Sequence, residues 1–342
     1  MRIGLDATYS IDKAPTGVAV YSQQILAGVA ASGFAEQCDW FYRSRKFWRA
    51  RKRPHPANAS PRFLHDWIGD RSADLFHGLN QRLPARRFRK QIATFHDLFV
   101  LSAEYSTADF RARFAEQARN AAAAADLVIA VSAFTASQIQ EYLHVPASRI
   151  RVVHHGVTPR TIPDVPREKV VLCVGAIQKR KNQPNLVRAF ESMPTDWSLV
   201  LAGSAGFGAT ATTDAVAKSP SRDRILVTGY VTEPELSEWY GKASIFAFPS
   251  FDEGFGIPIL EAMAAGIPVV TSDRSALPEV AGTAALTINP SDTDELAAAL
   301  NELASNETRR AQLQQLGLER AKQFTWQKAV EETLAVYREL LT

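Results

Sequence analysis

The stretch FPSFDEGFGIPILEAMAAGIPVV, residues 248–270, combines a strand end, a glycine-containing loop, a helix and the start of a second strand. The apolar run 245–250 predicts the first strand, and Pro258 suits the first position of the helix. Gly266 is placed to end that helix just after its C-cap, before the strand 269–272. Strand, helix and strand in this order indicate a parallel sheet covered by helices.

The same alternation of apolar runs and helical patterns extends through the whole chain. In the first half we expect strands at 2–8, 39–43, 74–78, 92–97, 126–132 and 150–156, and helices at 18–32, 109–125 and 133–142. In the second half we expect strands at 170–176, 199–203, 225–229, 245–250, 269–272 and 285–288, and helices at 182–191, 233–241 and 293–304. The segment 157–169 carries three prolines, which indicates a linker. The pattern predicts an α/β chain of two doubly wound, Rossmann-like parallel-sheet domains, residues 1–160 and 161–325, followed by an amphipathic helix within 326–342.

Composition agrees with an ordinary globular protein of two domains. The chain has 342 residues, of which 46% are hydrophobic and 22% charged, and this excludes disorder, collagen-like repeats and a disulfide scaffold. Cys38 and Cys173 lie 135 residues apart, which gives no metal-ligand spacing. No apolar run approaches the ~18 residues of a membrane span, and Asp6 comes too early for a secretory signal. We therefore expect a cytoplasmic chain.

Charge is distributed unevenly between the two halves. Residues 1–165 hold 22 Lys and Arg against 14 Asp and Glu, whereas residues 166–342 hold 17 against 22. The segment RSRKFWRARKR, residues 43–53, has seven basic positions out of eleven. Such a segment fits nucleic acid, anionic lipid or a phosphorylated substrate, and charge alone does not choose among them.

The loop between the strand and helix of 248–270 has the composition of an anion site. Gly254 and Gly256 let the backbone approach a ligand where a helix N-terminus exposes N–H groups. Glu253 and Glu261, eight positions apart, suit sugar hydroxyls on either side of a bound diphosphate. The alternative is a glycine-rich turn with two solvated glutamates.

Two other strand ends carry chemistry-bearing residues. In VGAIQKRKN, residues 174–182, Lys179, Arg180 and Lys181 are expected in the first turn of a helix, where an anion must offset the unfavourable dipole. The alternative is a solvated basic loop. In TFHDL, residues 94–98, His96 can donate hydrogen bonds to a substrate or exchange a proton near neutrality. The alternative is a histidine satisfied by backbone.

Several short motifs argue against other chemistries. Neither the Thr16-Gly17 turn nor the segment 203–208 has the G-x-G-x-x-G spacing of a dinucleotide site. Asp292-Thr293-Asp294 resembles a metal-binding D-x-D, but its position before an apolar helical pattern indicates an N-cap with a capping box completed by Asp294 or Glu295. We expect no metal and no cofactor.

Together these motifs resemble the retaining glycosyltransferases of family 4, which have the GT-B fold, and in particular their mannosyltransferase-like branch. The resemblance covers nearly the whole chain and includes TGVAVY, FHGLNQRLP, ATFHDL, ADLVIAVSAFTASQI, RIRVVHHGV, VGAIQKRKN, VTGYVTEPELSEWYGKASIFAFPS, the E-x7-E segment from Glu253 to Glu261, and SALPEV. It implies two domains facing a cleft, with the acceptor on residues 1–160, the donor on 161–325 and the helix of 326–342 packing back on the first domain.

The resemblance also implies roles for the charged residues. Glu261 matches the glutamate that holds the ribose hydroxyls of the nucleotide, and Glu253 matches the one that contacts the donor sugar. Arg180 and Lys181 match the basic pair that neutralises the diphosphate. Many relatives carry an arginine where this chain has Ala176, so fewer cations are expected around the diphosphate.

Further matching positions line the donor. Tyr230, after Gly229, lies where the base is usually flanked, His96 matches a histidine that faces the donor sugar, and Gly17 matches a glycine near the phosphates. The loop whose backbone N–H groups touch the donor comprises Gly254, Phe255, Gly256 and Ile257.

The mechanism implied by the resemblance follows the developing charge. Positive charge grows at the anomeric carbon, and negative charge grows on the leaving diphosphate, which Arg180, Lys181 and a helix N-terminus stabilise. We see no nucleophile in the first-half motifs, so a front-face reaction is favoured, in which the acceptor hydroxyl attacks on the leaving-group side and a phosphate oxygen takes its proton. His96 then positions the sugar.

The expected reaction moves a hexose, with mannose favoured, from a nucleotide diphosphate sugar to a glycan or lipid-linked glycan in polysaccharide or lipopolysaccharide biosynthesis. Alternatives are a GT-B sugar-nucleotide epimerase, a phosphorylase, or a non-catalytic sugar-binding protein. A nucleic-acid partner is not expected, because no helix-turn-helix, RNA-recognition or zinc signature accompanies the basic segment. That segment is expected to face the acceptor or the inner face of the cytoplasmic membrane, or to be a solvated loop. Its residues of interest are Arg43, Arg45, Lys46, Trp48 and Arg49.

Overall fold

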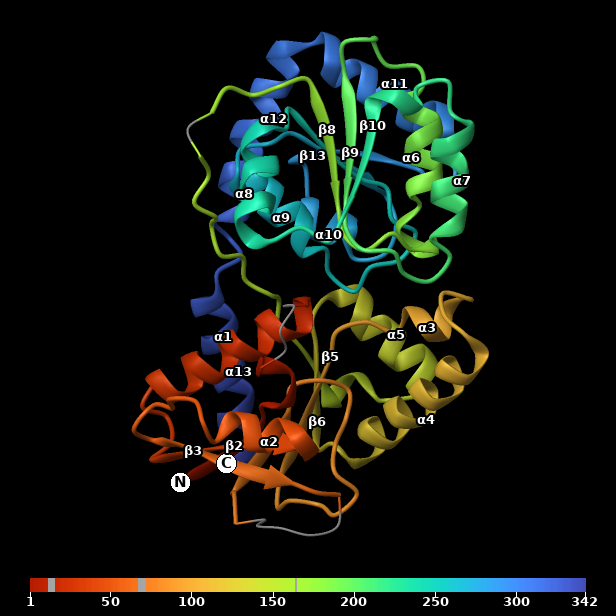
Figure 1. Ribbon diagram of the computed structural model, residues 1–342. Coiled ribbons are helices and arrows are strands. Elements are labelled where there is room, and N and C mark those ends of the chain that lie inside the picture. The colour runs from red at the N-terminus through yellow and green to blue at the C-terminus, as the bar shows by residue number, and fades with distance from the viewer. Residues whose placement is uncertain (12–15, 67–71, 164) are drawn as a thin grey trace. The chain divides into compact units, whose positions relative to one another are not determined.

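The computed structural model describes residues 1–11, 16–66, 72–163 and 165–342, and these divide into two compact units (Figure 1). Unit 1 comprises Met1–Ser102, Thr107–Gly156 and Trp326–Thr342, and unit 2 comprises Ala103–Ser106 and Val157–Thr325. Each unit holds one parallel β-sheet with helices on both faces, so the predicted α/β fold of two Rossmann-like sheets is confirmed. Apart from the short segment Ala103–Ser106, the chain passes from unit 1 to unit 2 after Gly156, where the proline-rich segment 157–169 begins.

The sheet of unit 1 is parallel throughout, in the order β3-β2-β1-β4-β5-β6-β7. Its strands are β1 (Arg2–Asp6), β2 (Gln37–Arg43), β3 (Ala59–Leu64), β4 (Leu75–Gly78), β5 (Gln91–Phe95), β6 (Leu127–Ala130) and β7 (Ile150–Val152). Strand β3 was not predicted: it is an edge strand that contains Pro61 and Arg62 and is only partly buried. The strand expected at 150–156 stops at Val152, and the residues beyond it form a loop.

Helices cover both faces of this sheet. They are α1 (Gly17–Ala31), α2 (Ser44–Ala50), α3 (Phe99–Ser102), α4 (Ala108–Ala124), α5 (Ala133–Leu143) and α13 (Trp326–Leu341), with short 3₁₀ turns η1 (Thr8–Ile11) and η2 (Ala147–Arg149). Side chains of Thr16, Thr107 and Ser132 cap α1, α4 and α5 by accepting a backbone hydrogen bond in the first turn. These caps account for the positions at which the three predicted helices begin.

Burial on both faces explains the nearly continuous apolar strands of unit 1. Ile92 and Ile129 belong to the core formed with α1 and α13, while their neighbours Ala93 and Val128 belong to the core formed with α4 and α5. Successive side chains of a strand point to opposite faces, so each strand contributes to two cores.

Helix α13 packs on α1 within unit 1. Gly28 allows this close approach, because a Cβ there would lie 2.3 Å from Cγ2 of Val330. The Tyr337 hydroxyl hydrogen-bonds Nδ1 of buried His77 at 2.7 Å, and Nε2 of that histidine hydrogen-bonds Thr94 at 2.8 Å. A buried polar chain therefore links α13 to β4 and β5.

Unit 2 has a six-stranded parallel sheet in the order β10-β9-β8-β11-β12-β13. The strands are β8 (Val170–Val174), β9 (Ser198–Ala202), β10 (Ile225–Gly229), β11 (Ile245–Phe248), β12 (Val269–Ser272) and β13 (Ala285–Ile288). All six were predicted, because most of their residues are apolar and buried. The two edge strands are less buried: β10 has Leu226 and Val227 exposed, and in β13 only Ile288 is buried.

The helices of unit 2 form two layers, with α6, α7 and α11 on one side of the sheet and α8, α9, α10 and α12 on the other (Figure 1). Their bounds are α6 (Gln183–Phe190), α7 (Thr210–Lys218), α8 (Glu233–Lys242), α9 (Ile257–Ala264), α10 (Leu277–Ala281), α11 (Thr293–Ser305) and α12 (Glu307–Ala321), with 3₁₀ turns η3 (Lys179–Lys181) and η4 (Arg222–Arg224). Within the described ranges, no helix is long and apolar enough to cross a membrane.

Candidate functional site

The strand order of unit 2 reverses between β8 and β11, which are neighbours in the sheet although three helices and two strands separate them in sequence. Ligands of open α/β sheets bind beyond the carboxyl ends of the strands at such a switch point. The loops at this point are residues 175–182 after β8 and residues 249–256 after β11. They are the two segments in which the sequence analysis placed its diphosphate-binding cations and Glu253.

A buried ion cluster joins these two loops. The Glu253 carboxylate contacts Nη1 of Arg180 at 2.7 Å and Nζ of Lys181 at 2.6 Å. Lys181 and Glu253 are only 7% and 8% exposed, and Nζ of the lysine lies 4.3 Å from the centre of the Phe248 ring. Arg180 Nη1 also donates to the backbone oxygen of Asp252 at 2.9 Å, so the cluster ties one loop to the other.

The three cations were expected in the first turn of an α-helix, but the structure places them before α6. Lys179–Lys181 form the 3₁₀ turn η3, which ends at Asn182 in the left-handed conformation with φ of 58°. Helix α6 begins only after that asparagine. The turn directs Lys181 into the interior and leaves Lys179 exposed, so only two of the three cations join the cluster.

The ionisation of the cluster follows from burial and its charge count. Burial by itself raises the pKa of Glu253, but Arg180 and Lys181 together lower that pKa to about 2. Burial lowers the pKa of Lys181, which has one carboxylate partner and the like charge of Arg180 beside it. Two cations around one carboxylate leave the cluster with an excess of positive charge.

The loop 254–257 leads into helix α9 in the way that the sequence predicted. Gly256 is the N-cap residue with φ of 106°, and a Cβ there would lie 2.8 Å from Cδ2 of Leu277. Because its N-cap residue is a glycine, α9, which begins at Ile257, receives no side-chain cap from that position. Gly266 has φ of 66° just after the C-cap of α9, so its predicted role as the residue that ends this helix is confirmed.

Glycines also shape the loop after β8. Gly175 has φ of 134° and lies against Lys181, because a Cβ there would be 3.3 Å from the lysine Cε. A Cβ at Gly203 would lie 2.1 Å from the backbone oxygen of Gly175. The segment 203–208 therefore acts as backbone support for the loop that carries the cluster. The backbone oxygen of Ala176 accepts a hydrogen bond from Nε2 of Gln183 at 3.1 Å.

Glu261, one turn into α9, has two partners that the sequence analysis missed. Nη2 of Arg160 donates to its Oε1 at 2.6 Å, and the Tyr240 hydroxyl donates to its Oε2 at 3.0 Å. Arg160 also pairs with Glu233 at the start of α8 and lies over the Tyr240 ring, 5.4 Å from its centre. Arg160 is in the stretch 157–169 that was predicted to be a linker, and no spacing in the sequence connects it to residue 261.

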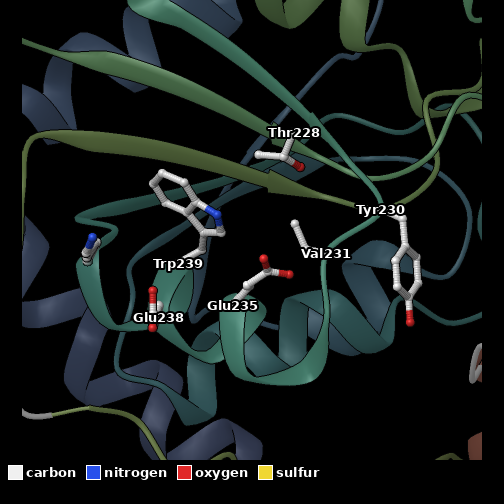
Figure 2. A pocket seen from close by; sticks show the side chains of 7 residues that line it. Thr228, Tyr230, Val231, Glu235, Glu238 and Trp239 are labelled. Carbon is white, nitrogen blue, oxygen red and sulfur yellow. The ribbon is translucent and has the colours of Figure 1, made fainter.

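A surface cavity of about 300 Å³ lies between the end of β10 and helix α8 (Figure 2). Gly229 ends the strand with φ of 71°, where the register with β9 shifts, and Tyr230 follows with 61% of its surface exposed. Figure 2 shows the side chains of Thr228, Trp239 and Glu235 around the cavity, with Tyr230 at its edge. The remaining lining residues are Val231, Glu238 and Lys242.

His96 is held by hydrogen bonds within unit 1. Its Nε2 donates to the backbone oxygen of Leu79 at 2.9 Å, so in the neutral ring Nδ1 is the unprotonated nitrogen, 3.4 Å from Nε2 of His155. The two histidine rings are stacked 5.3 Å apart, and Tyr21 packs edge-on at 4.8 Å. Burial lowers the pKa of His96 to about 4, so it does not exchange a proton near neutrality.

Gly17 is the first residue of α1, also in unit 1. It is exposed, and the Thr16 side chain caps the helix by accepting from the backbone N–H of Ala19 at 3.3 Å. Residues 12–15 of the loop before it lie outside the described residues.

The basic segment 43–53 was expected to be either a binding surface or a solvated loop. In the structure it consists of the last residue of β2, helix α2 and a turn. Arg43 does not belong to its exposed surface, because its side chain is 11% exposed and pairs with Asp66 at 2.8 Å and Asp6 at 3.6 Å. Lys46 lies 5.4 Å from the centre of the Tyr9 ring. The side chain of Arg45 lies outside the described residues.

Two residues of α2 do present exposed surface. Trp48 is 62% exposed, packs edge-on against Phe47 at 5.4 Å, and has the guanidinium of Arg51 5.7 Å from its ring centre. Arg49 is exposed and donates to the backbone oxygen of Ile11 at 3.3 Å. Residues 51–53 are exposed as well, so Arg43 is the expected surface residue that the structure removes from this segment.

The Asp292-Thr293-Asp294 motif is a helix cap, as predicted. Oδ1 of Asp292 accepts from the backbone N–H groups of Asp294 and Glu295 at 3.0 Å each. The capping box is not completed, because the Glu295 carboxylate accepts from the backbone of Asn289 instead. Across the described part of the chain, no three His, Cys, Asp or Glu side chains are grouped so that they could hold a metal ion.

Two Rossmann-like sheets, one with paired glutamates and cations at its switch point, define the GT-B class of glycosyltransferases. A family model described as "Glycosyl transferases group 1" matches residues 168–306, and one described as "Glycosyltransferase Family 4" matches residues 23–161. The chain belongs to this family of glycosyltransferases, as the resemblance in the sequence indicated.

Two curated relatives come from Escherichia coli. "O-antigen chain mannosyltransferase B" is 32% identical over 283 residues, which are 77% of this chain and 74% of the relative. "Serotype-specific mannosyltransferase WbdA" is 26% identical over 237 residues, 64% of this chain but only 29% of that longer protein.

Solved structures share the fold over the full chain. Sucrose-phosphate synthase from Thermosynechococcus elongatus has a TM-score of 0.77 at 21% identity, covering 99% of this chain and 98% of that one. Anabaena Alr3699/HepE in complex with UDP-glucose has a TM-score of 0.77 at 17% identity, covering 99% and 100%. The likeness confirms the GT-B fold and, at this identity, no more than the fold.

Proposed function

We propose that unit 2 binds a nucleotide diphosphate sugar and that the chain is a retaining glycosyltransferase that moves a hexose, with mannose favoured, to a glycan or lipid-linked glycan in polysaccharide or lipopolysaccharide biosynthesis. The observation that carries the proposal is the buried cluster of Glu253, Arg180 and Lys181 at the switch point between β8 and β11. The mannosyltransferase names of the curated relatives support mannose as the sugar.

The diphosphate is proposed to lie between the cluster and the N-terminus of α9. The cluster carries more positive than negative charge, and the N-cap residue of α9, Gly256, has no side chain that could cap the first turn. Both features favour an anion. Charge that develops on the leaving diphosphate is stabilised by Arg180 and Lys181, and removal of such preorganised contacts costs about 3–4 kcal/mol in a transition state. These cations supply the role that a divalent metal has elsewhere, so we propose a reaction without a metal or cofactor.

The nucleoside is proposed to extend from Glu261 towards the end of β10. Each oxygen of the Glu261 carboxylate has a second lone pair that can accept from a ribose hydroxyl. Tyr230 is exposed beside Gly229, where an aromatic face can flank a base. The base itself stays open between guanine, which mannose favours, and uracil, which the complexes of Anabaena HepE contain.

The reaction is proposed to proceed on one face of the sugar. The acceptor hydroxyl attacks the anomeric carbon on the side of the leaving diphosphate, the bond to the diphosphate oxygen breaks, and a phosphate oxygen takes the hydroxyl proton. Glu253 is proposed to contact sugar hydroxyls. His96 of unit 1, with its imidazole ring neutral, is proposed to position the sugar. Gly17 remains the proposed glycine near the phosphates.

Helix α2 is proposed to contribute to the acceptor side, on an anionic membrane surface. The exposed Trp48, with Arg49 and Arg51 beside it, has the amphipathic character that suits a membrane interface. A Trp48→Ala, Arg51→Ala double variant is expected to lose binding to vesicles of phosphatidylglycerol and to keep its nucleotide affinity. Unchanged vesicle binding would remove the membrane from the proposal.

A thermal-shift screen tests the donor. GDP, UDP, GDP-mannose and UDP-glucose are added at equal concentration, and a ligand at 100 times its Kd stabilises the fold by about 2.7 kcal/mol. We expect one nucleotide series to raise the Tm of the wild type, and Glu261→Gln to abolish most of that rise. Glu319→Gln, a change in an exposed ion pair on α12, is the matched control and should keep it.

The outcome of the screen separates the alternatives. If no nucleotide shifts the wild type, or if Glu261→Gln shifts as the wild type does, the donor site is wrong. Product analysis with the stabilising nucleotide sugar then distinguishes transfer to an added glycan from an epimerase, which changes the sugar without an acceptor, and from a sugar-binding protein, which leaves it intact.

A further inference from the structure

The arginine of the linker, Arg160, contacts Glu261, one of the proposed donor-binding side chains, and two residues of helix α8. Its guanidinium donates to Glu261 on α9, pairs with Glu233 at the start of α8, and lies over the ring of Tyr240. Arg160 itself is 15% exposed, so these contacts lie largely out of solvent. One side chain therefore bridges two helices that are separate in sequence.

The orientation of the Glu261 carboxylate is fixed from both sides. Arg160 bonds Oε1 and Tyr240 bonds Oε2, and these two donors come from different elements. Tyr240 is fully buried and cannot move without disturbing the core. A glutamate side chain has several rotatable bonds, so one without such partners loses conformational entropy when it binds a ligand. The two donors remove that freedom before the nucleotide arrives.

The contact geometry leaves the carboxylate able to bind. Arg160 uses one nitrogen for Glu261 and another for Glu233, so it does not cover both carboxylate oxygens as a bidentate arginine would. Each oxygen of Glu261 keeps one lone pair for a further donor. Two vicinal hydroxyls, such as those of a ribose, match two acceptors held side by side.

We propose that Arg160 is a positioning residue, which orients the Glu261 carboxylate so that it accepts the 2′- and 3′-hydroxyls of the donor nucleotide. This inference rests on the proposed function of unit 2. Arg160 does not itself touch the reacting atoms. If Arg160 acts by positioning, its removal lowers only the part of the nucleotide-binding energy that comes from the ribose hydroxyls. A residue that only stabilises the fold has no such selective effect.

The test compares nucleotides with and without those hydroxyls. Isothermal titration calorimetry gives the affinities of GDP and UDP and of their 2′,3′-dideoxy analogues for the wild type, Arg160→Met, Glu261→Gln and the double variant. We expect the wild type to prefer the hydroxyl-bearing form of its nucleotide by 10-fold or more, since hydrogen bonds to charged groups are among the strong ones. Arg160→Met should lose most of that preference and still bind the dideoxy form within about 2-fold of the wild type. The double variant should be no worse than Glu261→Gln.

A second arginine of the same linker is the matched control. Arg167 donates to the backbone oxygens of Tyr240 and Ala243, both at 2.7 Å, and also to that of Ala265. Its hydrogen bonds within the described part of the chain thus go to backbone oxygens and not to a carboxylate. Arg167→Met is expected to lower the Tm and to keep the full preference for ribose hydroxyls. Arg160→Lys, which retains the charge, should restore part of the preference.

Each other outcome overturns a defined statement. If Glu261→Gln loses the preference but Arg160→Met keeps it, the positioning role is wrong and the donor site stands. If Arg160→Met weakens both forms of the nucleotide equally, Arg160 is only structural and the inference is wrong. If the wild type shows no preference, or Glu261→Gln keeps it, the proposed role of Glu261 fails and the inference fails with it.

Discussion

The substitution Glu253→Gln isolates the electrostatic role of the buried cluster, because it removes one negative charge and keeps the size of the side chain. In the variant, Arg180 and Lys181 remain close together without the carboxylate that contacts both at 2.6–2.7 Å. Lys181 is almost fully buried and cannot be solvated in place. Unit 2 should therefore lose stability at neutral pH.

The expected size of this loss comes from the ionisation of Glu253. Its pKa falls from 4.5 to about 2 on folding, and a difference of this size corresponds to about 3 kcal/mol at pH 7. Removing one partner of a buried ion pair typically costs about 3–5 kcal/mol, which agrees. Because the folded-state pKa lies below the unfolded-state value, this stabilisation is present above pH 4.5 and is lost as the pH falls from about 4.5 to about 2. The difference between wild type and variant should shrink across that interval.

Hydrogen exchange during urea unfolding is the appropriate assay, since a chain of two units does not unfold in two states. Peptides from β8 and β11 report the unfolding free energy of unit 2. Glu319→Gln, in an exposed pair with Lys322, is the control and should change that free energy by less than about 0.5 kcal/mol. A Glu253→Gln variant as stable as the wild type at pH 7, or a loss that persists unchanged at pH 2.5, would refute the electrostatic reasoning.

Three further predictions concern two closely packed glycines and one buried hydrogen bond. Gly28→Ala should destabilise unit 1 by about 1–3 kcal/mol in urea unfolding through overpacking against Val330, and Val330→Ala added to it should restore most of the loss. Without that rescue, the packing of α13 on α1 is described wrongly. Gly203→Ala should weaken GDP or UDP binding at least 10-fold by calorimetry, because its Cβ would collide with backbone of the cluster loop. Equal affinity would show that the loop adjusts freely. Tyr337→Phe should cost unit 1 about 1–3 kcal/mol in the same unfolding assay, because buried His77 loses a hydrogen-bond partner, and an unchanged midpoint would contradict this.

Most of the strands that could be predicted from the sequence are buried along nearly their whole length. The strands of unit 2 are short apolar runs because most have helices on both faces. Strand β3 was missed, since an edge strand with Pro61 and Arg62 lacks that pattern. Helix α12 was also missed, because most of its residues are polar and only Leu313, Gly317 and Ala321 are buried.

The candidate site was predictable in its motifs but not in its contacts. The loop from Glu253 to Glu261 is local in sequence, so its glycines and its helix could be inferred. The ion pairs of Glu253 connect residues 72 and 73 positions apart, and that of Glu261 connects residues 101 positions apart. Only the fold brings such residues together. For the same reason Arg160 was assigned to a linker and Arg43 to an exposed basic surface.

The turn Lys179–Lys181 offers the most direct test of the central claim, that the buried cluster stabilises the leaving diphosphate. Lys181→Met removes a cation from the cluster, whereas Lys179→Met removes an exposed cation from the same turn. The measurement is kcat/KM for sugar transfer from the nucleotide sugar that stabilises the wild type. We predict a fall of about 100-fold or more for Lys181→Met and less than about 3-fold for Lys179→Met. Equal effects of the two substitutions would contradict the account.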